Sequence, residues 1–581
     1  MGPVRNARPE QDRRDRRGGV VLVAAVAALG PACGGEPEPA VIVTIAARPA
    51  TLTEQIGDLE VTVGNGGASK SQRFAVDGQA FPLTFSVTTG DRTGALDVSV
   101  RAFDADGNTL GVGQTQADLT VDELAMVLDP ADFVVNTEYA GSQRTGFDYD
   151  VAGYQLAGGR DRVTFGLRDN CMVAVCPLVG RRFDDHGRPL DTELGAGTGQ
   201  FRWTAGTGAD TGSELALAGL GDGGTIAAWD GAGGEVVCRS LPASGTGASA
   251  ERTLITEVNA DLVTANALAT GNVVLTWVAR TATSTYELKA TVVNPQCGTV
   301  TAPFVLAAPV DAFPRAGIAA GDQGVLFTWT DGPDLRYRLG TANGTVSGGV
   351  TTGTLLLAGS ASETMEYARP VALDDGYAVV YRANTVGGDS HPIRLRRVNS
   401  TGGVVGVDAV VGTFANAVGA HAVARRSDGA IAVAWETATP SDGGGTGIAF
   451  RVLRPTGLPV GDIMLVNSTR NGEQTDAQVA AIEGAFVIGF TDDSRQAPDS
   501  DDTSVRGRFV YPAYDEARGV LGANCLRNGF PDCDAGGVCV ADASGTPRCH
   551  AACDFAGSPP QCPGGGVCTQ MGDSAACILG G

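Results

Sequence analysis

The sequence predicts an all-β protein with three parts: an N-terminal β-sandwich, a ring of repeated four-stranded sheets and a small disulfide-rich C-terminal module. Three observations lead to this prediction. Apolar residues occur in short runs bounded by Gly, Asp, Asn and Thr, which is typical of strands. A short phrase recurs between about residues 160 and 490, and eight cysteines gather after residue 524. At 581 residues the chain is also too long for a single hydrophobic core.

The charge of the chain argues against a nucleic-acid partner. The formal net charge is −23, and no basic stripe that could follow a phosphate backbone is present. The basic residues are almost all arginine, because lysine occurs only at Lys70 and Lys289. We attribute this excess of arginine to codon bias in a GC-rich genome more than to arginine chemistry.

Residues 1–32 are predicted to be an export signal. Six arginines precede the apolar run from Val20 to Leu29, and this run is too short to cross a bilayer as a helix. Arg16-Arg17 raises the twin-arginine route, but the neighbouring residues do not complete that motif. The pattern therefore favours a general bacterial export signal.

The residues that follow place a lone cysteine after small residues, in the order Gly-Pro-Ala-Cys, ending at Cys33. This resembles the lipobox of bacterial lipoproteins, although Leu29 lies four residues before Cys33 where the family has an aliphatic residue three before. The resemblance implies acylation of Cys33 and a lipid anchor at the outer membrane or cell surface, facing outward or the periplasm. Cleavage after Ala32 that leaves a free thiol is the alternative. Residues 33–40 would form a short tether.

Residues 41–130 show the alternation of half-buried strands without a helical period. Four such strands are Val41–Ile45, Leu59–Val63, Leu83–Val87 and Leu96–Phe103. The stretch from Val98 to Leu110 resembles the late hairpin of bacterial immunoglobulin-like domains. This resemblance implies an Ig-like sandwich that serves as a spacer or adhesive module.

Residues 131–515 contain a repeat of about fifty residues. Each repeat has an Asp-Gly turn or a related turn, four or five β-prone residues, and then a large residue. These large residues are Leu167, Trp229, Trp277, Trp329, Tyr381, Trp435 and Phe490. Four short strands per repeat predict a β-propeller of seven blades. Six or eight blades are the alternatives, because the first repeat lacks an aromatic residue and has a Gly-rich insertion at about residues 194–213.

The last repeat lacks a fourth strand, and the sequence offers a replacement at the start of the ring. Residues Asp132–Thr137 resemble the fourth strand of the sixth repeat, Met464–Ser468, and Gln143 then corresponds to Gln474. Pairing this N-terminal strand into the last blade would close the ring and remove two exposed sheet edges. The phrase from Gly180 to Glu193 resembles that of bacterial propeller repeats, which implies a fold and no catalytic residue.

Residues 516–581 are predicted to be two copies of a cysteine module. The eight cysteines are Cys525, Cys533, Cys539, Cys549, Cys553, Cys562, Cys568 and Cys577. So many cysteines with almost no aliphatic core indicate a disulfide scaffold, which needs an oxidising compartment. Zinc is the less favoured alternative, because no pair has the C-x2-C spacing. The pattern resembles Cys-rich repeats on surface proteins of Gram-negative bacteria, and the spacing leaves all connectivities open.

Four further cysteines lie in the propeller region. Cys171 and Cys176 are close enough in sequence to join the two strands of a hairpin. Cys238 and Cys297 fall at non-equivalent positions of the second and third repeats, where a disulfide is one possibility.

No catalytic, cofactor or metal site is predicted. The four histidines are His186, His391, His421 and His550. None has the spacing of a triad or metal site, and no G-x-S-x-G, H-E-x-x-H or P-loop motif is present. The acidic stretch Asp492–Asp502 could hold calcium, but its spacing is not that of an EF-hand and a solvated loop is favoured.

The function predicted from these features is that of a membrane-anchored lipoprotein that binds or scaffolds a protein or polysaccharide. The alternative is a carbohydrate-active enzyme, a glycosidase or lyase, because the loops of a propeller converge on one funnel. The recurring Asp-Gly phrase invites comparison with the Asp-box of sialidases. It differs in spacing and in placement, so packing between blades is the favoured explanation of its aromatic residue.

Overall fold

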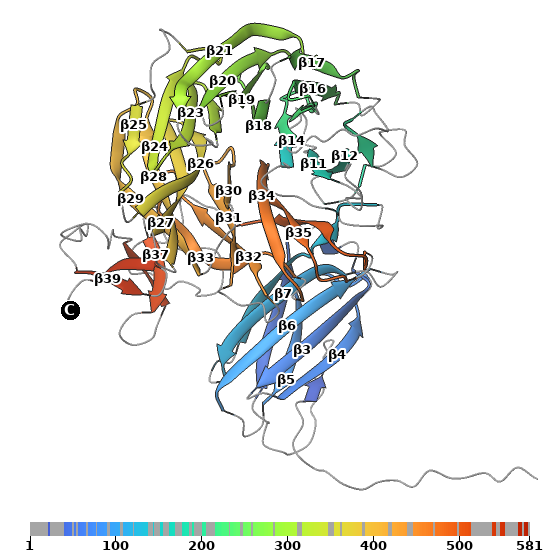
Figure 1. Ribbon diagram of the computed structural model, residues 1–581. Helices are drawn as coiled ribbons and strands as arrows, with labels where there is room; N and C mark the ends of the chain where they lie inside the picture. The colour runs from blue at the N-terminus through green and yellow to red at the C-terminus, as the bar shows by residue number, and fades with distance from the viewer. Residues whose placement is uncertain are drawn as a thin grey trace, which may run out of the picture. The chain divides into compact units, whose positions relative to one another are not determined.

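The computed structural model describes residues 21–23, 40–137, Gln143, 151–512 and four short strands after residue 536, with gaps in the loops throughout. It is an all-β protein, as predicted (Figure 1). In this part of the chain no helix is long and apolar enough to span a membrane. The chain divides into two compact units, Met1–Pro130 and Ala131–Gly581, which are described separately below.

The first unit is a sheet that folds over into two layers. Its strands lie in the order β1-β5-β2-β8-β7-β6-β3-β4, and β2 runs parallel to β8. A ladder of only two residue pairs joins β7 to β8, where one layer passes into the other. The strands are β1 (Val21–Val23), β2 (Ala40–Ala47), β3 (Asp58–Asn65), β4 (Ala68–Ala75), β5 (Leu83–Thr88), β6 (Ala95–Phe103), β7 (Thr109–Asp118) and β8 (Glu123–Pro130).

Alternation along the strands produces the core of this sandwich. Every second residue of β2, β3 and β6 is buried, so that Val43, Val63 and Val98 meet in one cluster with residues of β5 and β8. Strand β1 falls within the predicted export signal and pairs with β5 at the edge of the sheet. The remainder of that signal and residues 33–39 of the tether, Cys33 among them, lie outside the described residues.

The described residues of the second unit form seven four-stranded antiparallel sheets arranged in a ring, which confirms the seven-bladed β-propeller (Figure 1). Six blades are continuous in sequence. Blades one to three are β10 (Val151–Tyr154), β11 (Arg162–Arg168), β12 (Leu178–Asp184), β13 (Phe201–Arg202); β14 (Leu215–Gly219), β15 (Thr225–Asp230), β16 (Val236–Leu241), β17 (Arg252–Ile255); and β18 (Ala260–Ala267), β19 (Val273–Ala282), β20 (Thr285–Val293), β21 (Thr299–Val310). Blades four to six are β22 (Gly317–Gly321), β23 (Gly324–Asp331), β24 (Asp334–Gly340), β25 (Thr354–Leu357); β26 (Glu363–Leu373), β27 (Gly376–Thr385), β28 (Ser390–Asn399), β29 (Val404–Ala415); and β30 (His421–Arg425), β31 (Ile431–Thr437), β32 (Gly447–Leu453), β33 (Pro459–Leu465).

The seventh blade contains both ends of the ring, as predicted. Its strands are β34 (Gln474–Ile482), β35 (Ala485–Asp492), β36 (Ser504–Val510) and, from the start of the unit, β9 (Phe133–Val134). Strand β9 pairs antiparallel with β36, opposite Arg506 and Gly507. The large residues used to count the repeats all lie on the second strand of their blade and are buried: Leu167, Trp229, Trp277, Trp329, Tyr381, Trp435 and Phe490.

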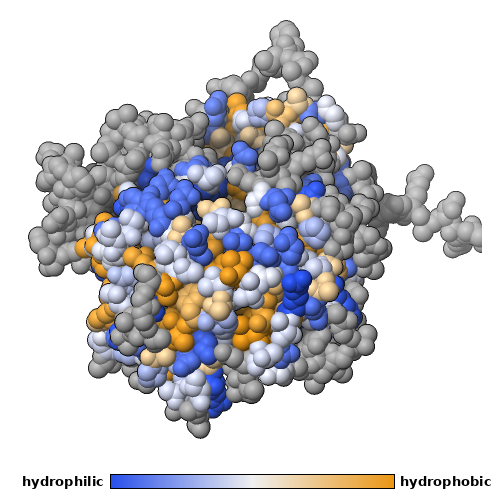
Figure 2. Space-filling view, turned by 90° about the horizontal axis from the view of Figure 1, so that it is seen from above, coloured by the Kyte–Doolittle hydropathy of each residue, from blue (hydrophilic) through white to orange (hydrophobic). Residues whose placement is uncertain are grey.

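The outer strands carry most of the exposed large hydrophobic residues of the propeller. Val407 on β29 is 60% exposed and Val300 on β21 is 54% exposed. Figure 2 shows that hydrophobic residues on the face in view occur in small groups separated by hydrophilic ones. On this face the mixed pattern is common for protein surfaces.

Arginines join neighbouring blades, which the sequence interpretation missed. Among the described residues, five strand-three arginines donate from Nη1 to a backbone carbonyl in or just after strand four of the preceding blade. These bonds are Arg181 to Val135 (2.9 Å), Arg239 to Trp203 (2.8 Å), Arg338 to Leu306 (2.9 Å), Arg451 to Val411 (2.9 Å) and Arg508 to Val466. A guanidinium has five fixed donors and can satisfy buried carbonyls at a distance. These five arginines therefore have a structural role in addition to any effect of genome composition on the arginine content.

The described part of the C-terminal region consists of two β-hairpins. They are β37 (Gly537–Ala541) with β38 (Pro547–Ala551), and β39 (Val567–Met571) with β40 (Ser574–Ile578). The register places Cys539 opposite Cys549 and Cys568 opposite Cys577. The two predicted cysteine modules thus share the same backbone register at their third and fourth cysteines.

Candidate functional site

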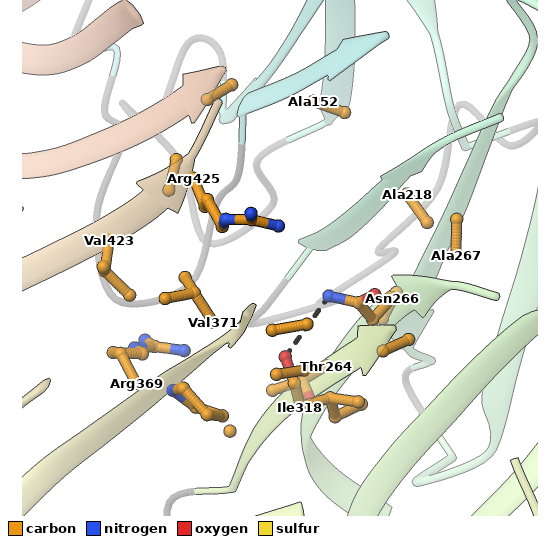
Figure 3. Close-up of a pocket in the computed structure, with 18 of the residues that line it drawn as sticks. Ala152, Ala218, Thr264, Asn266, Ala267, Ile318, Arg369, Val371, Val423 and Arg425 are labelled. Carbon is orange, nitrogen blue, oxygen red and sulfur yellow. Dashed lines mark hydrogen bonds between the residues drawn. The ribbon is translucent and has the colours of Figure 1, made fainter. Parts of the chain in front are cut away.

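The main cavity of the described residues is the central channel of the propeller. Its wall is formed by the first strand of every blade, from β10 round to β34, and its volume is about 690 Å³. Most of the lining is alanine, glycine, valine and leucine, as the close-up in Figure 3 illustrates. A volume of this size is typical of small-ligand sites in proteins.

Small residues are required in this wall because the inner strands approach each other closely. A β-carbon added to Gly317 on β22 would lie 2.4 Å from the carbonyl oxygen of Ala368 on β26. Added to Gly153 on β10, it would lie 2.5 Å from the carbonyl oxygen of Ala481 on β34. Glycine therefore sets how tightly blades four and five, and blades seven and one, pack at the axis.

Four charged residues interrupt this aliphatic lining. They are Asp322, Arg369, Asp374 and Arg425. Arg425 ends β30, and its Nη2 lies 2.6 Å from an oxygen of Asp374, at the end of the channel where strand one turns into strand two. The Asp374 side chain is 90% exposed, whereas that of Arg425 is 20% exposed. Figure 3 shows the Arg369 and Arg425 side chains extending from the wall into the channel.

Bulges shape the wall in blades three, five and seven. In each of these blades the pairing of strands one and two shifts register at a residue with positive φ: Leu262 (54°), Tyr367 (53°) and Asp476 (59°). Bulges and left-handed non-glycine residues are local departures from ideal backbone geometry that recur near functional sites. Within two residues of each bulge, a polar residue lines the channel: Thr264, Arg369 and Gln478.

A buried polar cluster lies beside Arg369, where blade five meets blade six. His421 on β30 is fully buried, and its Nε2 lies 3.1 Å from the carbonyl oxygen of Val380. Burial lowers the pKa of His421 to about 3, and the charges of Arg369 and Arg382 contribute in the same direction. Arg382 pairs with Glu366. The histidine is therefore neutral at physiological pH.

On the other side of blade six lies a carboxyl group with an unusual pKa. Burial raises the pKa of Glu436 to about 7, and the nearby charge of Asp476 adds to this effect. One oxygen of Glu436 accepts a hydrogen bond from the backbone N–H of Asp476 (2.7 Å), which links blades six and seven. Glu436 does not belong to the channel lining. The group could exchange a proton near neutral pH.

The acidic stretch Asp492–Asp502 is partly structural. Asp492 is fully buried and pairs with Arg506, and Asp499 accepts a hydrogen bond from Asn136 Nδ2 (2.7 Å). Burial raises the pKa of Asp499. The prediction of a solvated loop is therefore wrong for Asp492 and Asp499. Within the described residues, no group of three or more His, Cys, Asp or Glu side chains is arranged to hold a metal ion.

One of the candidate cysteine pairs forms a disulfide. Cys238 on β16 is bonded to Cys297, which follows β20, with 5.9 Å between their α-carbons. The bond therefore joins blade two to blade three, and both residues are buried. The other candidates remain predictions: Cys33, Cys171, Cys176, Cys525, Cys533, Cys553 and Cys562 lie outside the described residues, and Cys539, Cys549, Cys568 and Cys577 are described only in their backbone.

The charged residues of the channel were not identified from the sequence. Arg369 and Arg425 belong to first strands, whereas the repeat was counted by its second strands. A signal was present, because an arginine is unexpected in a strand that otherwise reads as Ala and Val, as in His421–Arg425. Of the four histidines, His421 lies in the buried cluster beside the channel, and His186 lies outside the described residues.

Comparison with known proteins gives fold-level likeness only. No protein-family model matches the chain, and no curated protein matches it. Solved structures that resemble it include an ulvan lyase (11% identity, 65% of this chain and 96% of that chain, TM-score 0.41) and a Hadza microbial sialidase (10%, 81% and 94%, TM-score 0.38). An α-L-arabinofuranosidase from Fusarium graminearum is also similar (12%, 51% and 92%, TM-score 0.36). At these values the likeness assigns no activity to this chain.

Proposed function

We propose that this chain is a membrane-anchored extracytoplasmic lipoprotein whose propeller binds a ligand in its central channel. The observation that carries the binding role is the channel itself. It combines a ligand-sized volume with charged and polar side chains set among small aliphatic ones. The described carboxyl group with a near-neutral pKa, Glu436, lies outside that wall. This arrangement favours binding over turnover.

The proposed location rests on the sequence of the N-terminus and on the disulfide. The Cys238–Cys297 bond supports an oxidising compartment, in agreement with an export signal and a lipid on Cys33. In a Gram-negative host expressing the gene, we expect the wild-type chain to fractionate with membranes and to incorporate labelled palmitate. The Cys33→Ser variant should become soluble and unlabelled. A Cys33→Ser protein that still pellets with membranes would contradict the lipid anchor.

A binding screen tests the role of the channel. We expect the purified chain to bind one or more polysaccharides or proteins saturably and without turnover. Narrowing the channel with Gln323→Phe should weaken this binding at least ten-fold, because Gln323 lines the channel and its side chain is exposed. The control Val407→Phe adds the same ring at an exposed position of β29 and should bind like the wild type. Equal effects of the two substitutions would place the ligand elsewhere.

A second candidate function is that of a carbohydrate-active enzyme that uses the propeller funnel. Two carboxylates, Asp322 and Asp374, line the channel, and carboxyl groups are the residue type that a glycosidase uses as acid and base. If the same screen detects turnover, Asp322→Asn should reduce kcat by about a hundred-fold or more with little effect on binding. Turnover that survives this substitution would remove Asp322 from the reaction.

A further inference from the structure

The two arginines of the channel define the chemistry of its occupant. Arg369 and Arg425 lie on the neighbouring strands β26 and β30, and both extend into the channel (Figure 3). The carboxylates of the lining, Asp322 and Asp374, are on exposed turns. The positive charges therefore face the interior of the channel while the negative charges of its lining face solvent.

Arg425 has hydrogen-bonding capacity that the described protein does not use. Its Nη2 donates to Asp374, but its Nε is buried and has no acceptor among the described residues. Several other arginines also have an unpaired buried Nε, among them Arg397 and Arg508. Of the arginines in this condition, Arg425 is the one that lines the channel. A buried donor without an acceptor is unfavourable, so a small shift of the Arg425 side chain that brought Nε to a ligand oxygen would be stabilising.

The donor geometry selects the kind of anion. Nε and Nη2 form the side-on fork of the guanidinium, and Nη2 has two hydrogens, of which Asp374 takes one. A planar carboxylate fits such a fork with two parallel hydrogen bonds. The long-range field of a chain with net charge −23 repels anions, but at physiological salt this field is screened beyond about 8 Å. The local charge inside the channel is therefore set by Arg369 and by Arg425, whose charge Asp374 partly offsets.

We propose that the channel binds a ligand that carries a carboxylate, held by Arg425 and attracted by Arg369. A short uronic-acid oligosaccharide has this chemistry. The inference rests on the proposed binding function of the channel, because it specifies the ligand of that same site. The inference can be wrong while the proposed function is right, because a channel that binds a neutral ligand would still be the binding site.

The test is calorimetric titration of the full-length protein with three probes: trigalacturonate, neutral galactotriose and acetate. We expect trigalacturonate to bind at least ten-fold more tightly than galactotriose. Acetate that competes at equal concentration would show that a free carboxylate suffices, and weak acetate competition would show that the sugar contributes. Both results support the carboxylate site. Equal binding of the acidic and neutral oligosaccharides would overturn the inference and leave the proposed function intact.

Variants then assign the site to Arg425. Arg425→Gln should weaken trigalacturonate binding at least ten-fold. Arg397→Gln is the matched control, because Arg397 pairs with Asp375 at 2.6 Å in a similar exposed ion pair but does not line the channel. Equal losses in the two variants would overturn the proposal.

Misfolding of the arginine variants could also weaken binding, so a variant that is expected to gain affinity provides an independent test. Asp374→Asn removes the competing carboxylate from Arg425 and should tighten trigalacturonate binding by about three-fold or more. Asp375→Asn changes the next residue, which pairs with Arg397, and should leave the affinity unchanged. Unchanged or weaker binding in Asp374→Asn would count against Arg425 as the carboxylate ligand.

Discussion

Blades six and seven follow the same hydrogen-bond pattern, but blade six is continuous in sequence whereas blade seven joins the two ends of the ring. In blade six, Asn467 Oδ1 accepts from the N–H of Ile448 on strand three (2.9 Å). Seven residues later, the N–H of Gln474 donates to the carbonyl oxygen of Thr446 (2.9 Å). These bonds tie the segment after strand four to the start of strand three.

Blade seven repeats these bonds with residues from the start of the ring. Asn136 Oδ1 accepts from the N–H of Val505 (2.9 Å), and the N–H of Gln143 donates to the carbonyl oxygen of Thr503 (3.1 Å). The closing strand therefore reproduces these two hydrogen bonds of blade six, although 369 and 360 positions separate the bonded residues. The comparison shows that the repeat specifies a local pattern that does not depend on chain continuity.

The two blades differ in which strand carries the large aromatic side chain. In blade six, Phe450 on strand three lies opposite Met464 on strand four. In blade seven the large residue is on strand four instead, since Phe133 lies opposite Gly507. A β-carbon at Gly507 would lie 2.6 Å from the Phe133 ring. Phe133 also packs against Phe165, Phe183 and Phe509, with ring centroids 4.8 to 5.9 Å apart. The short closing strand thus has an aromatic anchor.

The largest expected effect concerns the Cys238–Cys297 disulfide, which links blades two and three covalently. Among the described residues, the seam, which is the pairing of β9 with β36 where the two ends of the ring meet in blade seven, has no such bond. Removing the disulfide in a Cys238→Ser, Cys297→Ser double variant should lower the free energy of unfolding by about 4 kcal/mol, because it closes a segment of 59 residues. Denaturant unfolding can be followed by tryptophan fluorescence, since all five tryptophans lie in the propeller: Trp203, Trp229, Trp277, Trp329 and Trp435. A loss below about 1 kcal/mol would show that the noncovalent contacts between these blades suffice.

The next prediction concerns Phe133, the aromatic anchor of the closing strand in blade seven. Phe133→Ala should cost about 3 kcal/mol, at the lower end of the usual range because Phe133 is only half-buried. Met464→Ala, at the equivalent position of blade six, should cost about 2 kcal/mol. The same unfolding measurement decides between them. A smaller loss for Phe133→Ala than for Met464→Ala would mean that the ring does not depend on its aromatic anchor.

The paired asparagines test whether the two hydrogen-bond patterns are energetically equivalent. Asn136→Ala and Asn467→Ala each leave a backbone N–H without its acceptor, at a cost of about 2 kcal/mol. Asn136 should cost slightly more, because its Nδ2 donates to the carboxylate of Asp499 whereas that of Asn467 donates to the amide of Gln474. Unfolding of both variants in parallel gives the difference. A markedly smaller loss for Asn136→Ala would indicate that the seam tolerates an open ring.

The seam also shows how far the sequence could predict this structure. Asn136 and Gln143 could be aligned with Asn467 and Gln474 because the backbone bonds they make are local to the repeat. The side chains that line the channel could not be predicted in this way. Arg369 lines the channel two residues after the bulge at Tyr367, and a register shift of this kind has no distinct sequence signature.

The arginine bonds between blades were missed for a different reason. Arg451 and Arg508 each donate to a carbonyl of the preceding blade, and this partner is defined only once the ring is assembled. The buried state of Glu436 likewise depends on blade seven, because Asp476 supplies both the hydrogen bond and part of the electrostatic environment. Sequence periodicity predicts the blades, whereas contacts between blades require the assembled ring.

Glu436, which links the two compared blades, gives the smallest expected effect and a defined pH dependence. Its pKa is raised from about 4.5 to about 7 in the folded state, so between these values the folded chain binds more protons than the unfolded chain. Its contribution to stability is therefore fully present below about pH 4.5 and is lost as the pH rises to about 7. The full shift corresponds to about 3 kcal/mol, and we expect roughly half of this because the side chain is partly exposed and solvent screens its charge.

The measurement compares wild type with Glu436→Gln at pH 5 and pH 8, again by denaturant unfolding and tryptophan fluorescence. Taking the difference between the two proteins at each pH removes the opposite contribution of His421, whose lowered pKa of about 3 makes stability fall as the pH drops below about 6.5. Relative to Glu436→Gln, the wild type should lose about 1.5 kcal/mol between pH 5 and pH 8. If the difference in stability between the two proteins is the same at pH 5 and pH 8, Glu436 is ionised in the folded chain at pH 5. Its carboxyl group then carries no proton where blades six and seven meet.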